Sequence, residues 1–289
     1  MKLIRSSFEV LPQAPGLDGM YKQVELAARN CYQSFDKMTE NSHEKLLVHL
    51  GSNGHMSPFA HGTVYLKFPK NCDKSTYNHI LYDYRPNFWS KVVIENGDTH
   101  GVPSDAGYYV TTNMRVIKEN GWEDDLKYWC EPTEFHAKRI TVKVTCSIGI
   151  SRELNRHSTV LAIAESSTRY CNYSKDKFGA QITFVIPSTM ENLTPDYQSF
   201  GYEDITHEEL VFLDTIKNSE RAYLVMIKNG SKPQVARDVL PLSTATTVFY
   251  TAFDSDWKEV FKKRTTSACH PDMIALMKPI EEKFKELNL

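Results

Sequence analysis

Residues 152–178 constrain this chain more than any other segment, because they pack charged and hydroxyl side chains around one short apolar run, 160–164. The polar members are Arg156, His157, Glu165, Ser166, Ser167, Thr168 and Arg169. A guanidinium group matches phosphate or carboxylate in two-point contacts, and neighbouring hydroxyls add further donors. The segment therefore favours a lining for an anionic, oxygen-rich ligand. The alternative interpretation is an amphipathic helix whose charged face is solvated.

The segment resembles the signature of the flavin-dependent thymidylate synthases, the ThyX family. In that signature Arg-His-Arg, seven residues and Ser are followed closely by Arg-Tyr. Three further blocks are similar to the family and stand in the same order. Residues 28–32 with 54–61 resemble its Gly-His-x-Ser-x-x-Glu-His region, 236–241 resemble its Ala-Arg-x-x-Leu-Pro segment, and 256–264 resemble its closing dUMP-binding stretch. On these four blocks the chain is identified as a member of the family.

The motifs depart from the family pattern in three places. Ser158 replaces the last residue of Arg-His-Arg, which removes one cation from the flavin phosphate site, and Ala60 replaces a Glu. The spacing also differs by one residue, so that counting forward gives Ser166 as the motif serine and counting backward gives Ser167. On a regular helix one extra residue turns everything beyond it by about 100°. Either the donors are re-aimed or a local bulge absorbs the extra residue.

Composition narrows the class of protein. The 289 residues are 41% hydrophobic and 24% charged, which is ordinary for a soluble globular protein. No apolar run approaches the roughly 18 residues of a membrane helix, and the first residues lack a signal-peptide core. The net charge of -2 argues against a partner that is a nucleic-acid polymer. Six cysteines without a Cys-x-x-Cys pair fit reduced thiols, so we expect a cytoplasmic protein without a membrane partner. The histidines show no zinc-type spacing, and we expect no metal.

Periodicity and turn residues predict one α+β domain spanning 1–289. The expected strands are 61–68, 139–146 and 181–186. The expected helices are 20–32, 39–50, 112–130, 151–171, 207–229, 233–240, one with Trp257 and Phe261, and 272–287. Residues 71–111 are rich in Tyr, Asn, Asp, Gly and Pro and predict an irregular insertion with short elements. The resemblance adds a mixed or antiparallel sheet packed by long helices.

The resemblance implies a specific reaction. In the family, C5 of dUMP is methylated with the one-carbon unit of 5,10-methylenetetrahydrofolate, and FAD reduced by NADPH supplies the hydride. The phosphates of FAD and dUMP need cations or helix N-termini. No Gly-x-Gly-x-x-Gly loop follows a predicted strand, so we expect arginine side chains to hold these phosphates.

The resemblance also implies roles for single residues. The residues implied to bind FAD are His61, Thr63, Arg156, His157, Ser158 and Glu165. Those implied to bind the nucleotide are Glu153, Arg156, Glu165, Ser166, Ser167, Thr168, Arg169, Arg237 and Arg264. Arg237 is expected to reach the nucleotide of a neighbouring chain in a homotetramer. Arg264 is the expected catalytic residue, because it favours the ionised N3 of the pyrimidine and so raises electron density at C5.

Two other functions stay open at this point. The departures at Ser158 and Ala60 and the extra residue are compatible with a divergent enzyme that acts on another pyrimidine nucleotide or transfers a different group to C5. They are also compatible with a nucleotide- or flavin-binding relative that has lost turnover. Arg237 and Arg264 taken alone would be read as solvated helix arginines, and only their sequence contexts favour a site.

Overall fold

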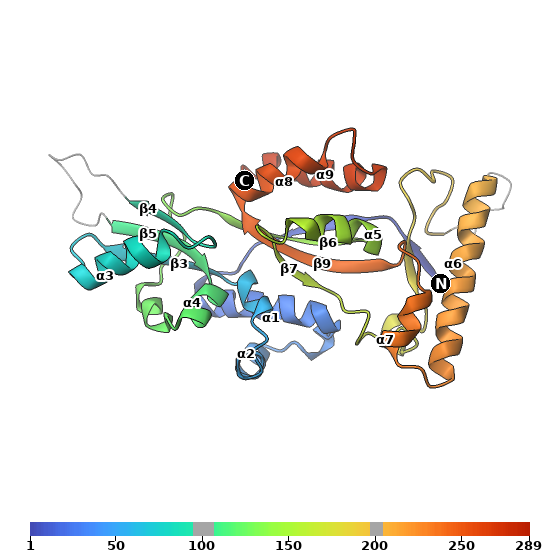
Figure 1. Cartoon of the computed structure of the whole chain (residues 1–289), viewed down its shortest axis with the longest axis horizontal. Coiled ribbons are helices and arrows are strands. Elements are labelled where there is room, and N and C mark those ends of the chain that lie inside the picture. The colour runs from blue at the N-terminus through green and yellow to red at the C-terminus, as the bar shows by residue number, and fades with distance from the viewer. Residues whose placement is uncertain (95–106, 197–204) are drawn as a thin grey trace.

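The computed structural model describes residues 1–94, 107–196 and 205–289, and a four-stranded antiparallel sheet runs through its centre (Figure 1). In sheet order its strands are β2 (Ser7–Leu11), β6 (Arg139–Ser147), β9 (Ala245–Phe253) and β7 (Ala162–Glu165). β6 and β9 are nine residues long and pair along their whole length. Strands β6 and β9 are therefore the two inner strands, each with a pairing partner on both edges.

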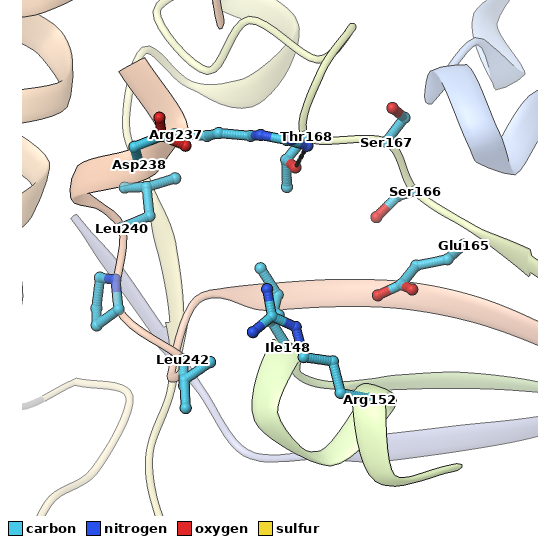
Figure 2. Close-up of a pocket in the computed structure, with 11 residues that line it drawn as sticks. Ile148, Arg152, Glu165, Ser166, Ser167, Thr168, Arg237, Asp238, Leu240 and Leu242 are labelled. Carbon is cyan, nitrogen blue, oxygen red and sulfur yellow. Dashed lines mark hydrogen bonds between the residues drawn. The ribbon is translucent and has the colours of Figure 1, made fainter. Parts of the chain in front are cut away.

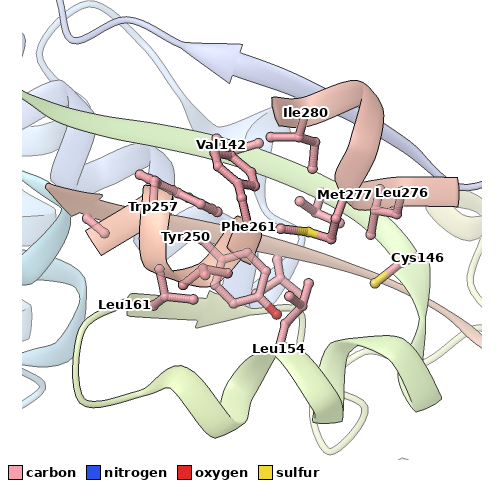
Figure 3. Close-up of a cluster of buried hydrophobic side chains, with 14 of the residues drawn as sticks. Val142, Cys146, Leu154, Leu161, Tyr250, Trp257, Phe261, Leu276, Met277 and Ile280 are labelled. Atoms are coloured by element: carbon pink, nitrogen blue, oxygen red, sulfur yellow. The ribbon is translucent and has the colours of Figure 1, made fainter. Parts of the chain in front are cut away.

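Helices cover both faces of this sheet, as the side-chain alternation of a strand requires. Val248, Tyr250 and Ala252 of β9 point toward α8 (Asp254–Arg264) and α9 (Pro271–Glu286), where Trp257 and Met277 are buried with them (Figure 3). The short helix α5 (Ile148–Leu154) closes the same core.

On the opposite face, Phe249 of β9 and Ala164 of β7 pack against Ala27 of α1 (Gly16–Tyr32). The α1 residue Asn30 is buried, and its Nδ2 donates to the backbone oxygens of Ala164 and Thr247, each at 2.8 Å. Helix α2 (Ser42–Ser52) lies beside α1.

The segment 71–111, expected to be an irregular insertion with short elements, contains short helices and strands where the structure describes it. Strands β3 (Thr63–Pro69), β5 (Gly107–Asn113) and β4 (Lys91–Ile94) form an antiparallel sheet beside α3 (Lys74–His79) and a π-helical turn. Residues 95–106 of the insertion lie outside the described part. The helix expected over 112–130 is wrong in extent. Helix α4 is only Met114–Asn120, because Asn113 caps it and Gly121, at φ +70°, ends it before a 3-10 turn at Glu123–Tyr128.

A third group of elements lies at the far end of the molecule from β3, β4 and β5 (Figure 1). It contains the parallel pair β1 (Lys2–Ile4) and β8 (Thr183–Val185), the long helix α6 (His207–Lys228), and α7 (Pro233–Ala236) with a 3-10 turn at Arg237–Val239. The N-terminus of α6 is fixed by a capping box between Thr206 and Glu209. The expected α+β class is confirmed, whereas the count of one domain stays a prediction.

The helix expected over 151–171 is wrong. Helix α5 ends at Leu154 and passes through a 3-10 turn at Asn155–His157, and the run 162–165 is strand β7. The backbone nitrogens of Val160 and Leu161 both donate to the oxygen of His157, which reverses the chain before β7. A five-residue apolar run fits a buried strand as well as a helix. Because the signature is not one continuous helix, the 100° rotation expected for an extra residue does not arise.

Candidate active site

A cavity of about 720 Å³ lies where the chain leaves β7 and faces α5 and the loop after α7 (Figure 2). Its lining is Ile148, Arg152, Glu165, Ser166, Ser167, Thr168, Arg237, Asp238, Leu240, Pro241 and Leu242. Five of these were expected to bind the nucleotide, and the structure brings them together from two segments about 70 residues apart. The cavity lies within the ordinary size range of ligand sites.

Glu165 is held in one orientation by three donors. Its Oε1 accepts from the hydroxyls of Ser151 (2.8 Å) and Thr246 (3.1 Å), and its Oε2 accepts from Asn155 Nδ2 at 3.0 Å. The hydroxyl of Tyr250 donates to Asn155 Oδ1 at 2.9 Å and extends the network into the core. A carboxylate with this many donors is fixed in place before any ligand arrives.

The two candidate motif serines differ in their contacts. Ser166 Oγ lies 3.0 Å from Thr246 Oγ1 and accepts from the Thr247 backbone nitrogen at 3.2 Å, so it joins β9. Ser167 Oγ accepts only a local bond, from the backbone nitrogen of Arg169 at 3.3 Å. Among the residues that the structure describes, the Ser167 hydroxyl has no acceptor, so its proton is available to a ligand in the cavity.

Two guanidinium groups face the cavity from opposite sides. Arg237 comes from the 3-10 turn after α7, and its terminal nitrogen donates to Thr168 Oγ1 at 3.0 Å. Arg152 projects from α5 on the opposite side of the cavity from Arg237, beside Ile148 (Figure 2). Arg152 was not among the site residues predicted from the sequence. Its spacing of four from Ile148, which lies on the same face of α5, was the available signal.

Arg169, expected to bind the nucleotide, is not part of this lining. Its guanidinium carbon lies 5.4 Å from the ring centroid of Tyr170, whose ring is in turn 5.4 Å from that of Tyr32. Both tyrosines are exposed, at 59% and 42% of their surface. Arg169 thus faces a neighbouring aromatic surface.

Arg264, the expected catalytic residue, lies in a separate cluster at the other end of α5. Its Nε donates to His157 Nε2 at 2.8 Å, one amino group donates to the backbone oxygen of Glu153 at 2.7 Å, and the other lies 3.4 Å from Glu153 Oε2. Burial, together with the positive charge of Arg264, lowers the pKa of His157. The structure therefore joins three expected site residues, but it does not bring them into the lining of the main cavity.

His61 and Thr63, expected to bind FAD, are buried. His61 Nδ1 lies 2.8 Å from Thr251 Oγ1 of β9, and burial, aided by the charge of Arg139, lowers its pKa to about 3. Arg139 donates to Thr63 Oγ1 at 3.3 Å and to the Ala60 backbone oxygen at 3.0 Å. Both side chains are held by protein contacts in the interior.

Ser158 and Ala60, the two replaced motif positions, line one cavity of about 260 Å³ at the N-terminal end of β7. Arg156 is exposed at the turn before Ser158. The N-terminal block and the signature, about 100 residues apart in sequence, therefore meet in space.

The sequence profile of the Thy1 family, described as thymidylate synthase complementing protein, matches residues 128–287. The chain belongs to this family. The matched range contains the whole lining of the main cavity and the Arg264 cluster. Membership supports a thymidylate synthase type of activity, the C5 methylation of dUMP. The blocks at 28–32 and 54–61 lie outside the match, so the FAD-binding roles of His61 and Thr63 stay predictions.

Among solved structures, the chain is similar to PolB from Streptomyces cacaoi, a UMP/dUMP methylase bound with 5-Br dUMP. The identity is 16%, the TM-score is 0.43, and the match covers 99% of this chain and 93% of that one. No curated protein matches the chain significantly.

Among the residues that the structure describes, no helix has both the length and the apolar character to cross a bilayer. The same residues contain no group of three or more His, Cys, Asp or Glu side chains placed to hold a metal ion.

Proposed function

We propose that this chain is a flavin-dependent thymidylate synthase that methylates C5 of dUMP. The carbon donor is 5,10-methylenetetrahydrofolate, and the hydride comes from FAD reduced by NADPH. One observation carries the proposal: residues 165–168 converge with Arg152 and Arg237 around one cavity within the range that matches the family.

The lining of this cavity suits a pyrimidine nucleotide. Arg152 and Arg237 supply positive charge for the phosphate, and the hydroxyls of Ser167 and Thr168 supply polar groups for the sugar. Ile148, Leu240 and Leu242 add apolar surface. In the single chain Arg237 already bonds Thr168, so this contact does not need a neighbouring chain. We still propose a homotetramer, which a tetrameric mass in light scattering at micromolar concentration would support.

Arg264 is proposed to stabilise negative charge on the pyrimidine as C5 attacks the carbon donor. Arg264 lies with Glu153 and His157 at the C-terminal end of α5. We therefore propose that the dUMP phosphate binds near Arg237 and that the uracil base points toward this end of α5. The contacts to Glu153 and His157 hold the guanidinium in place, which limits its reorganisation during the reaction.

No protein nucleophile is needed in this mechanism. Cys171 lies just beyond the cavity segment, and burial raises the pKa of its thiol. A protonated thiol is a poor nucleophile. The side chains of the cavity therefore act by binding, orienting and stabilising charge.

The residues near Ser158 fit a phosphate-bearing cofactor. Arg156 is exposed, has no hydrogen-bond or ion-pair partner among the residues that the structure describes, and precedes a residue that lines a cavity. We propose that Arg156, His157 and Ser158 hold FAD there. When bound, FAD supplies the hydride that completes the methyl group.

The test is the release of tritium from 5-tritiated dUMP, with each of the carbon donor, NADPH and FAD omitted in turn. We expect release only in the complete mixture. Release from 5-tritiated UMP but not from dUMP would assign another pyrimidine nucleotide, and release from neither would leave a binding protein without turnover. Arg237→Ala should slow release, whereas Arg221→Ala, at an exposed position on α6, should leave it unchanged.

A further inference from the structure

Two cavities outside the proposed nucleotide site meet at one arginine. The cavity of about 260 Å³ beside Ser158 and a neighbouring one of about 460 Å³ share three lining residues, Ser57, Arg115 and Glu119. The shared residues place the two cavities side by side in one region between α1, the segment 54–58, α4 and the turn before β7. We call it the Arg115 groove.

Arg115 is the cation at the centre of this groove. Its Nε donates to Glu119 Oε1 at 2.7 Å, one helical turn away on α4. Among the residues that the structure describes, its two amino groups have no partner, and the side chain is 46% exposed. Glu119 thus holds one edge of the guanidinium and leaves the other edge, with its two parallel donors, available to a ligand.

The groove offers an aromatic ring on each side of Arg115. Trp89 lines the cavity that contains Ser158, and Tyr32 lines the other. Aromatic rings pack well against other planar rings, and a guanidinium fork matches phosphate oxygens. A dinucleotide has the same order of groups, with a pyrophosphate between two ring systems.

We propose that the Arg115 groove binds a dinucleotide and that Arg115 contacts its phosphates. The inference rests on the proposed function for the identity of the ligand, because that reaction uses two dinucleotides, FAD and NADPH. Ser158 shares this groove and stands where the family signature has an arginine. Arg115 therefore supplies, from another helix, a cation near the place where the signature lacks one.

The experiment measures the affinities of purified wild-type protein, Arg115→Ala and Arg115→Lys for FAD, NADP⁺ and riboflavin. Arg221→Ala is the control, and thermal melting checks that each variant is folded. We expect Arg115→Ala to weaken FAD or NADP⁺ about tenfold or more, which is the size of one lost charge-assisted contact. Riboflavin has no phosphate, so its affinity should not change. Arg115→Lys should restore part of the loss, since a point charge lacks the fork.

A second variant separates a phosphate contact from a general disturbance. Ser158→Arg, added to Arg115→Ala, should recover affinity for the same dinucleotide, because both positions line the same cavity. Unchanged affinity in Arg115→Ala, or equal losses for riboflavin and the dinucleotide, would overturn the inference, and tritium release in the same preparation would show that the proposed function stands. Conversely, Arg115-dependent binding without tritium release would support the groove and reject the proposed function. A wild-type protein that binds neither dinucleotide would reject both.

Discussion

The Nε atom of Arg264 donates a hydrogen bond to Nε2 of His157 at 2.8 Å. A ring nitrogen that accepts a hydrogen bond cannot carry a proton, so His157 is neutral in this contact and its proton is on Nδ1. Burial and the charge of Arg264 act in the same direction and lower the pKa of His157. The signature and the C-terminal motif, about 100 residues apart in sequence, are thereby in direct contact, and the charge of one affects the titration of the other.

The first prediction concerns Arg264. Arg264→Ala should lower the rate of dUMP methylation about 10²–10³-fold while weakening nucleotide binding less, because the proposed charge develops only in the transition state. Arg264→Lys should recover part of the rate. The pKa of His157, followed by NMR, should rise in Arg264→Ala. Lys262→Ala, at an exposed position on the same helix, is the control. Wild-type rates with an unmoved His157 pKa would remove Arg264 from the mechanism.

The second prediction compares two arginines of the motifs. Arg237 lines the main cavity, whereas Arg169 lies over the ring of Tyr170. Arg237→Ala should weaken dUMP about tenfold in calorimetry, since it removes a charge-assisted contact to the phosphate. Arg169→Ala should weaken it less. Deoxyuridine, which has no phosphate, should bind both variants as it binds the wild type. A larger loss for Arg169→Ala would mean that the phosphate lies elsewhere.

The third prediction separates Ser166 from Ser167. The Ser166 hydroxyl joins β7 to β9, so Ser166→Ala should lower the free energy of unfolding by about 1 kcal/mol. Ser167→Ala should leave the melting temperature close to wild type but weaken dUMP. Melting curves and calorimetry on the two variants decide between them. The reverse pattern would make Ser166 the ligand-binding serine.

The fourth prediction is a pH dependence that originates at His61. Its pKa is lowered to about 3 by burial, with Arg139 adding to the effect, whereas an unfolded histidine titrates near 6.5. As the pH falls from about 6.5 toward 3, the unfolded chain takes up a proton that the folded chain does not. The free energy of unfolding should therefore decrease by up to about 1.4 kcal/mol per pH unit from this residue alone. Above about pH 6.5 this contribution is constant.

Urea unfolding at pH 7, 6 and 5 measures this slope. His61→Gln should be less stable at pH 7 yet show a shallower slope than the wild type. His207→Gln, at an exposed position on α6, should keep the wild-type slope. If His61→Gln also kept that slope, the proton uptake would belong to other groups.

The sequence predicts the amphipathic elements well, because their pattern is local. Helices α1, α2, α6, α8 and α9 and strands β3, β6 and β8 lie within a few residues of the expected ranges. The helix predicted across 160–164 was wrong because five consecutive apolar residues show neither helical nor strand periodicity. Pairing with β9 makes this segment a strand. Strand β9 itself was not assigned. It is buried on both faces and lacks a simple alternation of apolar and polar residues.

The candidate site was predictable in composition but not in arrangement. The signature and the block around Arg237 named five residues of the main cavity. Arg152 was missed because its helix is short and its direction depends on how α5 packs on β9. Arg169 follows the cavity residue Thr168 in the sequence, yet its side chain packs on Tyr170. Arg264 belongs to a family motif, yet its side chain bonds His157 outside the main cavity.

The turn between His157 and β7 separates the signature into two halves that belong to different elements. Each half is anchored by its own contacts, Arg264 for the first and β9 for the second. An insertion or deletion in the turn between His157 and β7 therefore changes only the length of that turn. The contacts of each half stay as they are. Search patterns that demand a constant gap between the two halves would pass over chains of this kind, whereas patterns with a variable gap would retrieve them.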